Sequence, residues 1–158
     1  MSREPGDDLR QAVGEEMQAM QAAVDAYDEA AARVLGVNRT DLRCLELLMR
    51  HGALTPGRIG PELGLTTGSV TAMLDRLERL GYATRSPDPG DRRKVLVTMT
   101  DTAREKAWRL YGPFATEGDA LMREYSDADL EVLAGFLRRS RELYERQLER
   151  TLKEHAEK

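Results

Sequence analysis

Residues 56–81 read PGRIGPELGLTTGSVTAMLDRLERLG, and this stretch decides the fold. It opens with a proline at an early helix position, where no backbone donor is needed. Gly64-Leu65 forms a tight turn, and from Thr67 to about Leu80 apolar residues recur on one helical face. A short helix, a turn and a second amphipathic helix predict a helix-turn-helix. An ordinary helical hairpin with a solvated outer face fits the same pattern, so the stretch alone leaves both interpretations open.

The outer face of the second helix is small and hydroxylated at its N-terminal end. Such a surface can approach the floor of the major groove and hydrogen-bond to base edges or phosphates. The free amides of a helix N-terminus also favour phosphate. The residues of this helix that we predict to contact DNA are Thr66, Thr67, Gly68, Ser69, Thr71 and Arg76.

A β-hairpin is predicted directly after this helix. Tyr82–Arg85 and the alternating, β-branched run Lys94–Thr100 are the strand candidates, and the SPDPGD of residues 86–91 is turn chemistry. An arginine on a protruding hairpin can enter the narrow minor groove, where negative potential is focused. We expect an acid at the tip to hold Arg93 or Arg92 extended through a charged hydrogen bond. The predicted contacts of this wing are Asp91, Arg92, Arg93 and Lys94. A solvated turn with scattered charge is the alternative interpretation of the tip.

Long amphipathic helices are predicted on both sides of this lobe. An apolar stripe with heptad-like spacing runs from about Asp8 to Leu35, and a second follows an N-cap at Ser126. Between them a helix begins at Asp101, with a kink or a break expected at Gly112-Pro113. The stripes exceed what a small lobe can cover, which favours a shared dimer interface. The predicted interface residues are Val13, Met17, Met20, Leu137, Tyr144 and Leu148.

The fold class predicted from this order is mainly α with a small β-hairpin wing. We expect one continuous domain with three parts. Residues 1–36 form an N-terminal dimerisation helix, residues 37–100 form the winged helix-turn-helix lobe, and residues 101–158 form C-terminal helices that complete the dimer base.

Charge is distributed unevenly along the 158 residues, whose net charge is −4. Residues 55–100 hold seven basic and five acidic residues, a net +2, so the rest of the chain carries −6. The basic middle is the part predicted to meet DNA, a dense anion. The single cysteine excludes an intrachain disulfide, and no apolar run predicts a signal peptide or a membrane span. These features predict a cytoplasmic protein.

Catalytic and metal-binding motifs are absent from the sequence pattern. We find no nucleophile with a base and no phosphate loop, so no enzyme activity and no cofactor are predicted. His51 and His155 are not spaced as zinc ligands, so no metal site is predicted. Cys44 stands beside Leu45 and Leu48 and is interpreted as a packed thiol.

The chain resembles the MarR (multiple antibiotic resistance regulator) family of winged helix-turn-helix regulators. The resemblance is carried by TDLR at 40–43, IGPELGL at 59–65, SVTAMLDRLERLGY at 69–82 and DRRKVLVTMT at 91–100. It implies a homodimer built on the first and last helices, with Thr67–Leu80 as the recognition helix. It also implies that Arg93 lies in the minor groove with Asp91 as its partner.

The same resemblance implies a repressor that occupies a palindromic operator in double-stranded DNA. A small aromatic or phenolic ligand would release the DNA from a cleft between the dimer base and the lobe, and Tyr27, Met49 and Met73 are the predicted lining. Peroxide-sensing members carry a cysteine in the first helix, whereas Cys44 lies in the second, which argues against thiol sensing by that scheme. The alternative function is a dimeric winged-helix protein-interaction module without specific DNA binding.

Overall fold

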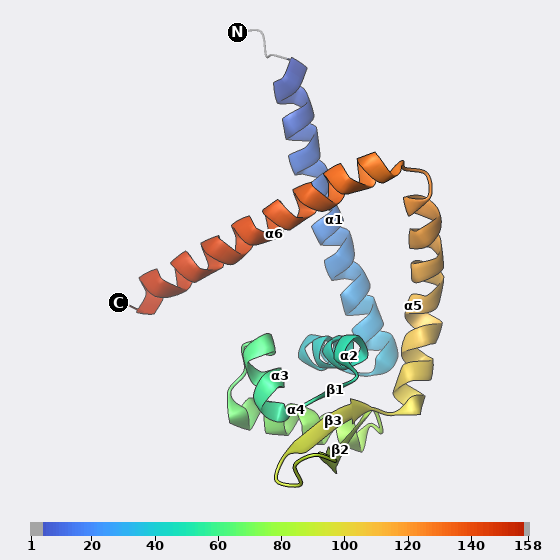
Figure 1. Ribbon diagram of the computed structural model, residues 1–158, viewed down its shortest axis with the longest axis vertical. Helices are drawn as coiled ribbons and strands as arrows, with labels where there is room; N and C mark the ends of the chain where they lie inside the picture. Colours follow the sequence, from blue (N-terminus) through green and yellow to red (C-terminus); the bar gives the residue numbers. More distant parts are fainter. Residues whose placement is uncertain (1–4, 157–158) are drawn as a thin grey trace. The chain divides into compact units, whose positions relative to one another are not determined.

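A computed structural model describes residues 5–156 of the chain (Figure 1). The chain divides into two compact units, which meet between Leu110 and Tyr111. The elements are α1 (Pro5–Leu35), α2 (Arg39–His51), β1 (Ala53–Leu54), α3 (Pro56–Leu63), α4 (Thr67–Arg79), β2 (Ala83–Pro87), β3 (Val95–Met99), α5 (Asp101–Met122) and α6 (Asp127–Ala156). The mainly helical fold with a small wing is therefore confirmed. The predicted division into residues 1–36, 37–100 and 101–158 stays a prediction.

Local capping explains where the helices of the first unit begin and end. The Asn38 side chain accepts a hydrogen bond from the backbone N–H of Asp41 at 2.9 Å, and the Asp41 carboxylate accepts one from the N–H of Asn38 at 3.3 Å. This capping box starts α2 at Arg39. Gly64 ends α3 with φ +66°, a conformation that disfavours a side chain. The helix-turn-helix predicted from residues 56–81 is thus formed by α3 and α4.

The sheet is antiparallel with strand order β1-β3-β2. The predicted hairpin is formed by β2 and β3, with Ala83 opposite Met99 and Pro87 opposite Val95. The sequence did not predict β1, a two-residue strand that pairs with β3 through Ala53 and Leu54. A strand of this length has no recognisable periodicity, and its pairing with a segment more than forty residues away forms only in the folded lobe.

The core of the first unit is aliphatic and joins α2, α3, α4 and the sheet. Figure 1 shows these elements gathered at one end of the long helix α1. The core side chains are Leu42, Leu45 and Leu48 from α2, Ile59 from α3, Val70, Met73, Leu74 and Leu77 from α4, and Val97 and Met99 from β3. Because one face of α4 is buried here, its opposite face is held toward solvent.

Helix α5 continues through Gly112-Pro113, so of the kink or break predicted there, the break does not occur. Proline removes one backbone donor from a helix, and the flanking turns on either side retain helical structure. The hydroxyl of Thr116 donates to the carbonyl of Gly112 at 3.1 Å. Ser126 caps α6 as predicted, since its hydroxyl accepts from the backbone N–H of Asp129 at 3.2 Å. Among the described helices, none is both long and apolar enough to cross a bilayer.

Candidate nucleic-acid interface

The first turn of α4 presents hydroxyl groups to solvent. Thr66 is the N-cap, and its Oγ1 accepts from the backbone N–H of Ser69 at 3.3 Å and lies 2.9 Å from the Ser69 hydroxyl. Thr71 donates its hydroxyl to the carbonyl of Thr67 at 3.1 Å. Thr66, Thr67, Ser69 and Thr71 are all exposed, as is Gly68. The hydroxyls are therefore positioned by the helix itself and retain acceptor capacity toward a ligand.

The Arg76 side chain is bonded within the lobe, although the sequence analysis included it among the predicted DNA contacts. Its Nε and Nη2 donate to the two carboxylate oxygens of Asp41, at 2.8 and 2.6 Å. Asp41 is fully buried, and a hydrogen bond to its carboxylate raises the pKa of Arg76. We therefore assign Arg76 to holding α4 against α2 and do not retain it as a proposed DNA contact.

A hollow of about 330 Å³ separates the N-terminal ends of α3 and α4. A Cβ at Gly57 would meet no atom within 4 Å, so this part of the surface is open. The hollow is lined by Pro56, Gly57, Gly60, Pro61, Leu65, Thr66, Thr67, Val70 and Thr71. Its hydroxyls and open backbone give a concave surface that can accept a phosphate or a base edge.

The tip of the wing is ordered by two aspartates. Asp88 Oδ1 accepts from the backbone N–H of Gly90 at 2.7 Å and of Asp91 at 3.3 Å, which closes the turn. Asp91 Oδ1 accepts from both the backbone N–H and the Nε of Arg93, each at 3.2 Å. The predicted pairing of Asp91 with an arginine is thus present, and the arginine is Arg93.

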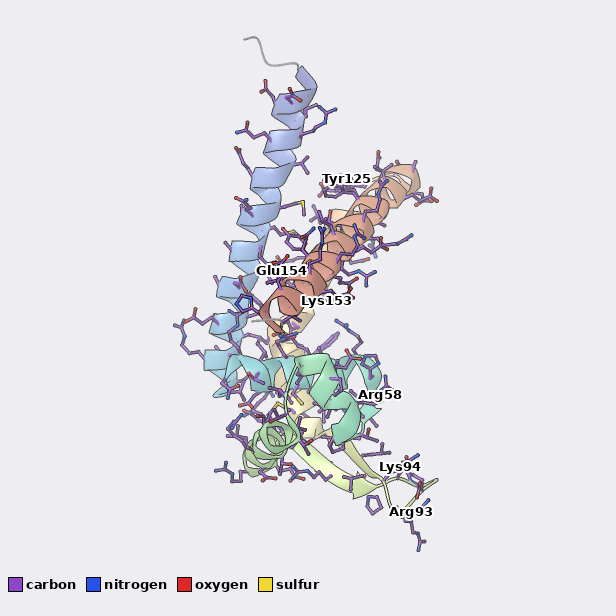
Figure 2. All side chains as sticks on the ribbon, turned by 90° about the vertical axis from the view of Figure 1, so that its left-hand side faces the viewer. Arg58, Arg93, Lys94, Tyr125, Lys153 and Glu154 are labelled. Atoms are coloured by element: carbon purple, nitrogen blue, oxygen red, sulfur yellow. The ribbon has the colours of Figure 1, made fainter. Side chains whose placement is uncertain are left out.

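Arg93 is a strongly exposed cation at the tip of the wing. Its side chain remains 91% exposed despite the contact with Asp91. Figure 2 shows it at the end of the hairpin, directed away from the lobe, with Lys94 beside it. Lys94 Nζ lies 3.9 Å from the Asp91 carboxylate, and Arg92 is exposed. Asp91 thereby orients two of the three cations at the tip.

Arg58 of α3 is a further exposed cation that the sequence analysis did not include. It lies along the same edge of the lobe as Lys94 and Arg93 in Figure 2, and α3 packs against β3. Within residues 5–156, Arg58 forms no ion pair with an acidic side chain. The sequence signal was its position two residues after Pro56, in the first turn of the first helix of the helix-turn-helix.

The residues predicted for the dimer interface lie on exposed apolar faces of single helices. In α1, Val13 and Met20 are exposed and Met17 is half-buried. In α6, Leu137, Tyr144 and Leu148 are exposed. Within residues 5–156, these side chains remain wholly or partly exposed in their own units, and their role in dimerisation remains a prediction.

The three residues predicted to line a ligand cleft are not brought together. Met73 is 1% exposed in the core beneath α4, whereas Met49 is 52% exposed. Tyr27 donates its hydroxyl to the carbonyl of Leu110 at 3.0 Å. Met73 is a core side chain because it shares the buried face of α4 with Val70 and Leu77. A different cavity of about 300 Å³ is lined by Val34, Leu35, Lys106, Arg109 and Leu110.

Cys44 is a packed thiol, as interpreted from the sequence. It is fully buried, and burial, assisted by the negative charge of Asp41, raises its pKa to about 12. The thiolate is the reactive form of cysteine, so this environment disfavours reaction. Within residues 5–156, no group of three or more histidine, cysteine, aspartate or glutamate side chains is placed to hold a metal ion.

Comparison with known proteins identifies the family of this lobe. The sequence profile of the MarR family matches residues 37–95. The chain is 38% identical over 124 residues to YcgE of Bacillus subtilis, an uncharacterised HTH-type transcriptional regulator, covering 78% of this chain and 80% of that protein. The matched length extends well beyond the lobe into the flanking helices.

Solved structures share the fold at lower identity. YusO from Bacillus subtilis aligns with a TM-score of 0.61 at 20% identity, covering 88% of this chain and 99% of that one. A mutant MarR from E. coli, crystallised in complex with operator DNA, aligns with a TM-score of 0.55 at 19% identity, covering 87% of this chain and 99% of its own. The winged helix-turn-helix fold is thereby confirmed.

Proposed function

This chain belongs to the MarR family of DNA-binding HTH-type transcriptional regulators, and from that premise we propose that it is a cytoplasmic repressor that binds a palindromic operator as a homodimer and is released by a small ligand. The family membership implies regulation and not catalysis. One observation carries the proposal for this chain's own residues. Arg93 is held out from the wing by Asp91 while the hydroxylated start of α4 is exposed on the same lobe.

The two parts of the lobe have different tasks in this proposal. Thr66, Thr67, Gly68, Ser69 and Thr71 enter the major groove, where small polar side chains can read base edges. Arg93 enters the minor groove, whose negative potential attracts arginine. Arg92, Lys94 and Arg58 contact phosphates, because they are exposed cations on the edge next to the wing tip.

Dimerisation places two such lobes on one duplex. A palindrome offers two half-sites about one helical turn apart, and a two-fold symmetric protein matches that spacing. The exposed apolar positions of α1 and α6 support this assembly, because apolar stripes on long helices are stabilised when they are covered. Linking two lobes converts the second contact into an intramolecular one and raises the affinity for paired half-sites.

Ligand release is supported by the cavity between α1 and α5. Its lining combines three apolar side chains with Lys106 and Arg109, a composition suited to an apolar small molecule with a polar group. Lys106 Nζ donates to the Tyr82 hydroxyl at 2.9 Å, and that hydroxyl donates to the carbonyl of Leu35 at 2.8 Å. Tyr82 follows α4 by three residues, so a ligand that displaces Lys106 would disturb the end of the recognition helix.

The test is a fluorescence-anisotropy titration against the duplex upstream of the protein's own gene, with a scrambled duplex of equal length. Titrations at about 50 and about 200 mM salt measure the electrostatic contribution. We expect tighter binding to the native duplex and steep weakening with salt. Equal and weak binding to both duplexes would contradict operator recognition and would favour a protein-interaction module.

Two sets of variants separate the tasks of the two parts. Arg93→Ala should weaken binding to both duplexes and reduce the salt slope by up to about 0.9 for each lost phosphate contact. Ser69→Ala and Thr71→Ala should change which sequences are preferred while leaving the salt slope unchanged. If Arg93→Ala had no effect on either duplex, the wing would have no part in DNA binding.

A further inference from the structure

Arg85 of β2 joins the wing to the recognition helix through a cluster of contacts. Its Nη1 donates to Asp75 Oδ1 at 2.7 Å and to the Glu78 carboxylate. Its Nη2 donates to the carbonyl of Thr71 at 3.3 Å. Thr71, Asp75 and Glu78 are four and three residues apart and therefore form one stripe along α4. A single guanidinium thus spans about two turns of the helix that is proposed to read DNA.

The strand backbone takes part in the same cluster. β2 is an edge strand, so its outer edge has no strand partner. Glu78 Oε1 accepts the backbone N–H of Arg85 at 3.0 Å and covers that edge. Glu78 therefore accepts both from the backbone and from the side chain of Arg85. The contact is partly shielded from water, since the Arg85 side chain is 25% exposed.

These contacts give the wing a second attachment to α4. The first is the chain itself, which turns from α4 into β2 at Gly81 with φ +70°. The base of the hairpin is also held by β1, whose Leu54 pairs with Val97 of β3, and by the burial of Val97 and Met99 in the core. Arg85 pairs with Val97 of β3, level with the pairing of Leu54 with the same Val97. β1 therefore holds the β3 side of the hairpin at this level, and the Arg85 guanidinium ties the outer edge of β2 to α4. Burial disfavours the charge of Arg85, but its bonds to Asp75 and Glu78 more than offset this, and its pKa is raised.

We propose that Arg85 is a positioning residue that fixes the distance between the wing and the recognition helix and so determines the preference of the lobe for its operator. This inference rests on the proposed function, because it concerns how the two DNA-contacting parts are spaced. A duplex presents the major and minor grooves at separations that depend on its sequence. A lobe whose wing and recognition helix are held at a fixed distance binds few such duplex geometries, whereas a lobe with a mobile wing binds many.

Charge neutralisation is the competing explanation for the same cluster. Asp75 is exposed on α4, and an unpaired acid there would repel phosphates from any sequence. Loss of Arg85 would then weaken binding to all duplexes alike. The two explanations are separated by removing Asp75 and Glu78 together with Arg85. No acid then repels phosphates, so neutralisation predicts normal binding. The attachment of the wing to α4 is still lost, so the positioning role predicts a loss of preference for the operator.

The experiment compares Arg85→Ala, Arg85→Lys and the triple variant Arg85→Ala/Asp75→Asn/Glu78→Gln in the full-length protein. The readout is the ratio of affinities for the operator and the scrambled duplex at several salt concentrations. We expect this ratio to fall about tenfold in all three variants, the size of one mismatched base pair. We expect the affinity for the scrambled duplex to recover in the triple variant. Arg79→Ala is the matched control, because Arg79 lies on the same helix with its Nε bonded to the Asp75 carbonyl at 3.3 Å.

Hydrogen exchange of the backbone amides provides a readout that does not depend on DNA. We expect faster exchange in β2 and β3 of Arg85→Ala, with unchanged exchange in α2 and α3. The proposal would be overturned if the triple variant kept the wild-type ratio of affinities for the operator and the scrambled duplex. It would also be overturned if amide exchange in the hairpin of Arg85→Ala were unchanged. Charge neutralisation would then remain as the role of Arg85. If the wild-type protein bound both duplexes equally, the proposed function would fail, and exchange in the hairpin would still show whether Arg85 holds the wing.

Discussion

The guanidinium of Arg76 binds the buried carboxylate of Asp41 through two hydrogen bonds, and this pair ties the second half of α4 to the first turn of α2. The same carboxylate accepts the backbone N–H of Asn38 and so completes the cap of α2. Asp41 thereby caps the start of α2 and binds α4 through Arg76. The orientation of the recognition helix depends on this pair as well as on the apolar core.

Replacing Arg76 with alanine should destabilise the lobe. The change leaves the buried Asp41 carboxylate without its cation. Because the Arg76 side chain is 38% exposed, water partly replaces it, and we expect a cost of about 1–3 kcal/mol. The measurement is urea unfolding followed by circular dichroism, with all variants at one protein concentration because a dimer's stability depends on it. Arg79→Ala is the control and should change the free energy of unfolding by less than about 0.5 kcal/mol. Equal effects of the two changes would contradict a structural role for the pair.

Replacing Asp91 with alanine should separate affinity from specificity at the wing. The change removes a negative charge near the DNA, so the scrambled duplex should bind as tightly as before or more tightly. It also removes the acceptor that holds Arg93, so the preference for the operator should fall. The measurement is the anisotropy titration against both duplexes. Asp101→Asn, which removes a charge at the start of α5, should leave the preference unchanged. A wild-type preference in Asp91→Ala would show that Arg93 needs no such support.

Cys44 should react slowly with thiol reagents while the protein is folded. Its pKa is raised from an ordinary value of 9.0 to about 12 by burial and by Asp41, so little thiolate exists at pH 8. Labelling with a chromogenic disulfide at pH 8 should be slow in buffer and fast in urea. Rapid labelling of the native protein would contradict a closed, protonated environment.

The same raised pKa makes a contribution to stability that depends on pH. The folded state keeps the Cys44 proton at pH values where the unfolded state has lost it. This contribution is therefore complete below about pH 9 and is lost as the pH rises toward about 12. Cys44→Ala should lose stability less steeply across that window in urea titrations. Parallel pH profiles for the two proteins would contradict the shift.

Gly60 should tolerate no side chain, in contrast to Gly57 in the same helix. A Cβ at Gly60 would lie 3.2 Å from the Leu65 carbonyl and 3.4 Å from Val70 Cγ2, which are both on the α4 side of the turn. Gly60→Ala should therefore push α3 from α4 and cost about 1–3 kcal/mol. Gly57→Ala meets no atom within 4 Å and should leave the thermal unfolding midpoint unchanged or slightly raised. A midpoint for Gly60→Ala equal to that of the wild type would show that the turn can adjust.

Sequence reasoning succeeded where the signal is local. Residues 56–81 carry the helix, glycine turn and second helix in order, and α3 and α4 follow that order. Turn chemistry and alternating β-branched residues predicted the hairpin, and the contact of Asp91 with Arg93 joins residues only two apart. Such features depend on backbone preferences and on neighbours along the chain, which the sequence states directly.

Sequence reasoning failed where one element meets another that is distant along the chain. Arg76 shares its helix with the predicted DNA contacts, but its partner Asp41 lies 35 residues earlier and only the folded lobe brings the two together. β1 forms because the backbone of Ala53 and Leu54 pairs with the open edge of β3. The residues predicted to line a ligand cleft do not lie together, because Met73 faces the core.

The sequence by itself determined the family, the helix-turn-helix with its following hairpin and the cationic wing tip, because periodicity, caps and turns act over a few residues. The tertiary structure alone decided which charges are free to meet DNA. Arg93 and Arg58 reach solvent, whereas Arg76 and Arg85 are bound by acids from other parts of the chain or the neighbouring helix. A side chain's charge is visible in the sequence, but its partner is set by packing across the core.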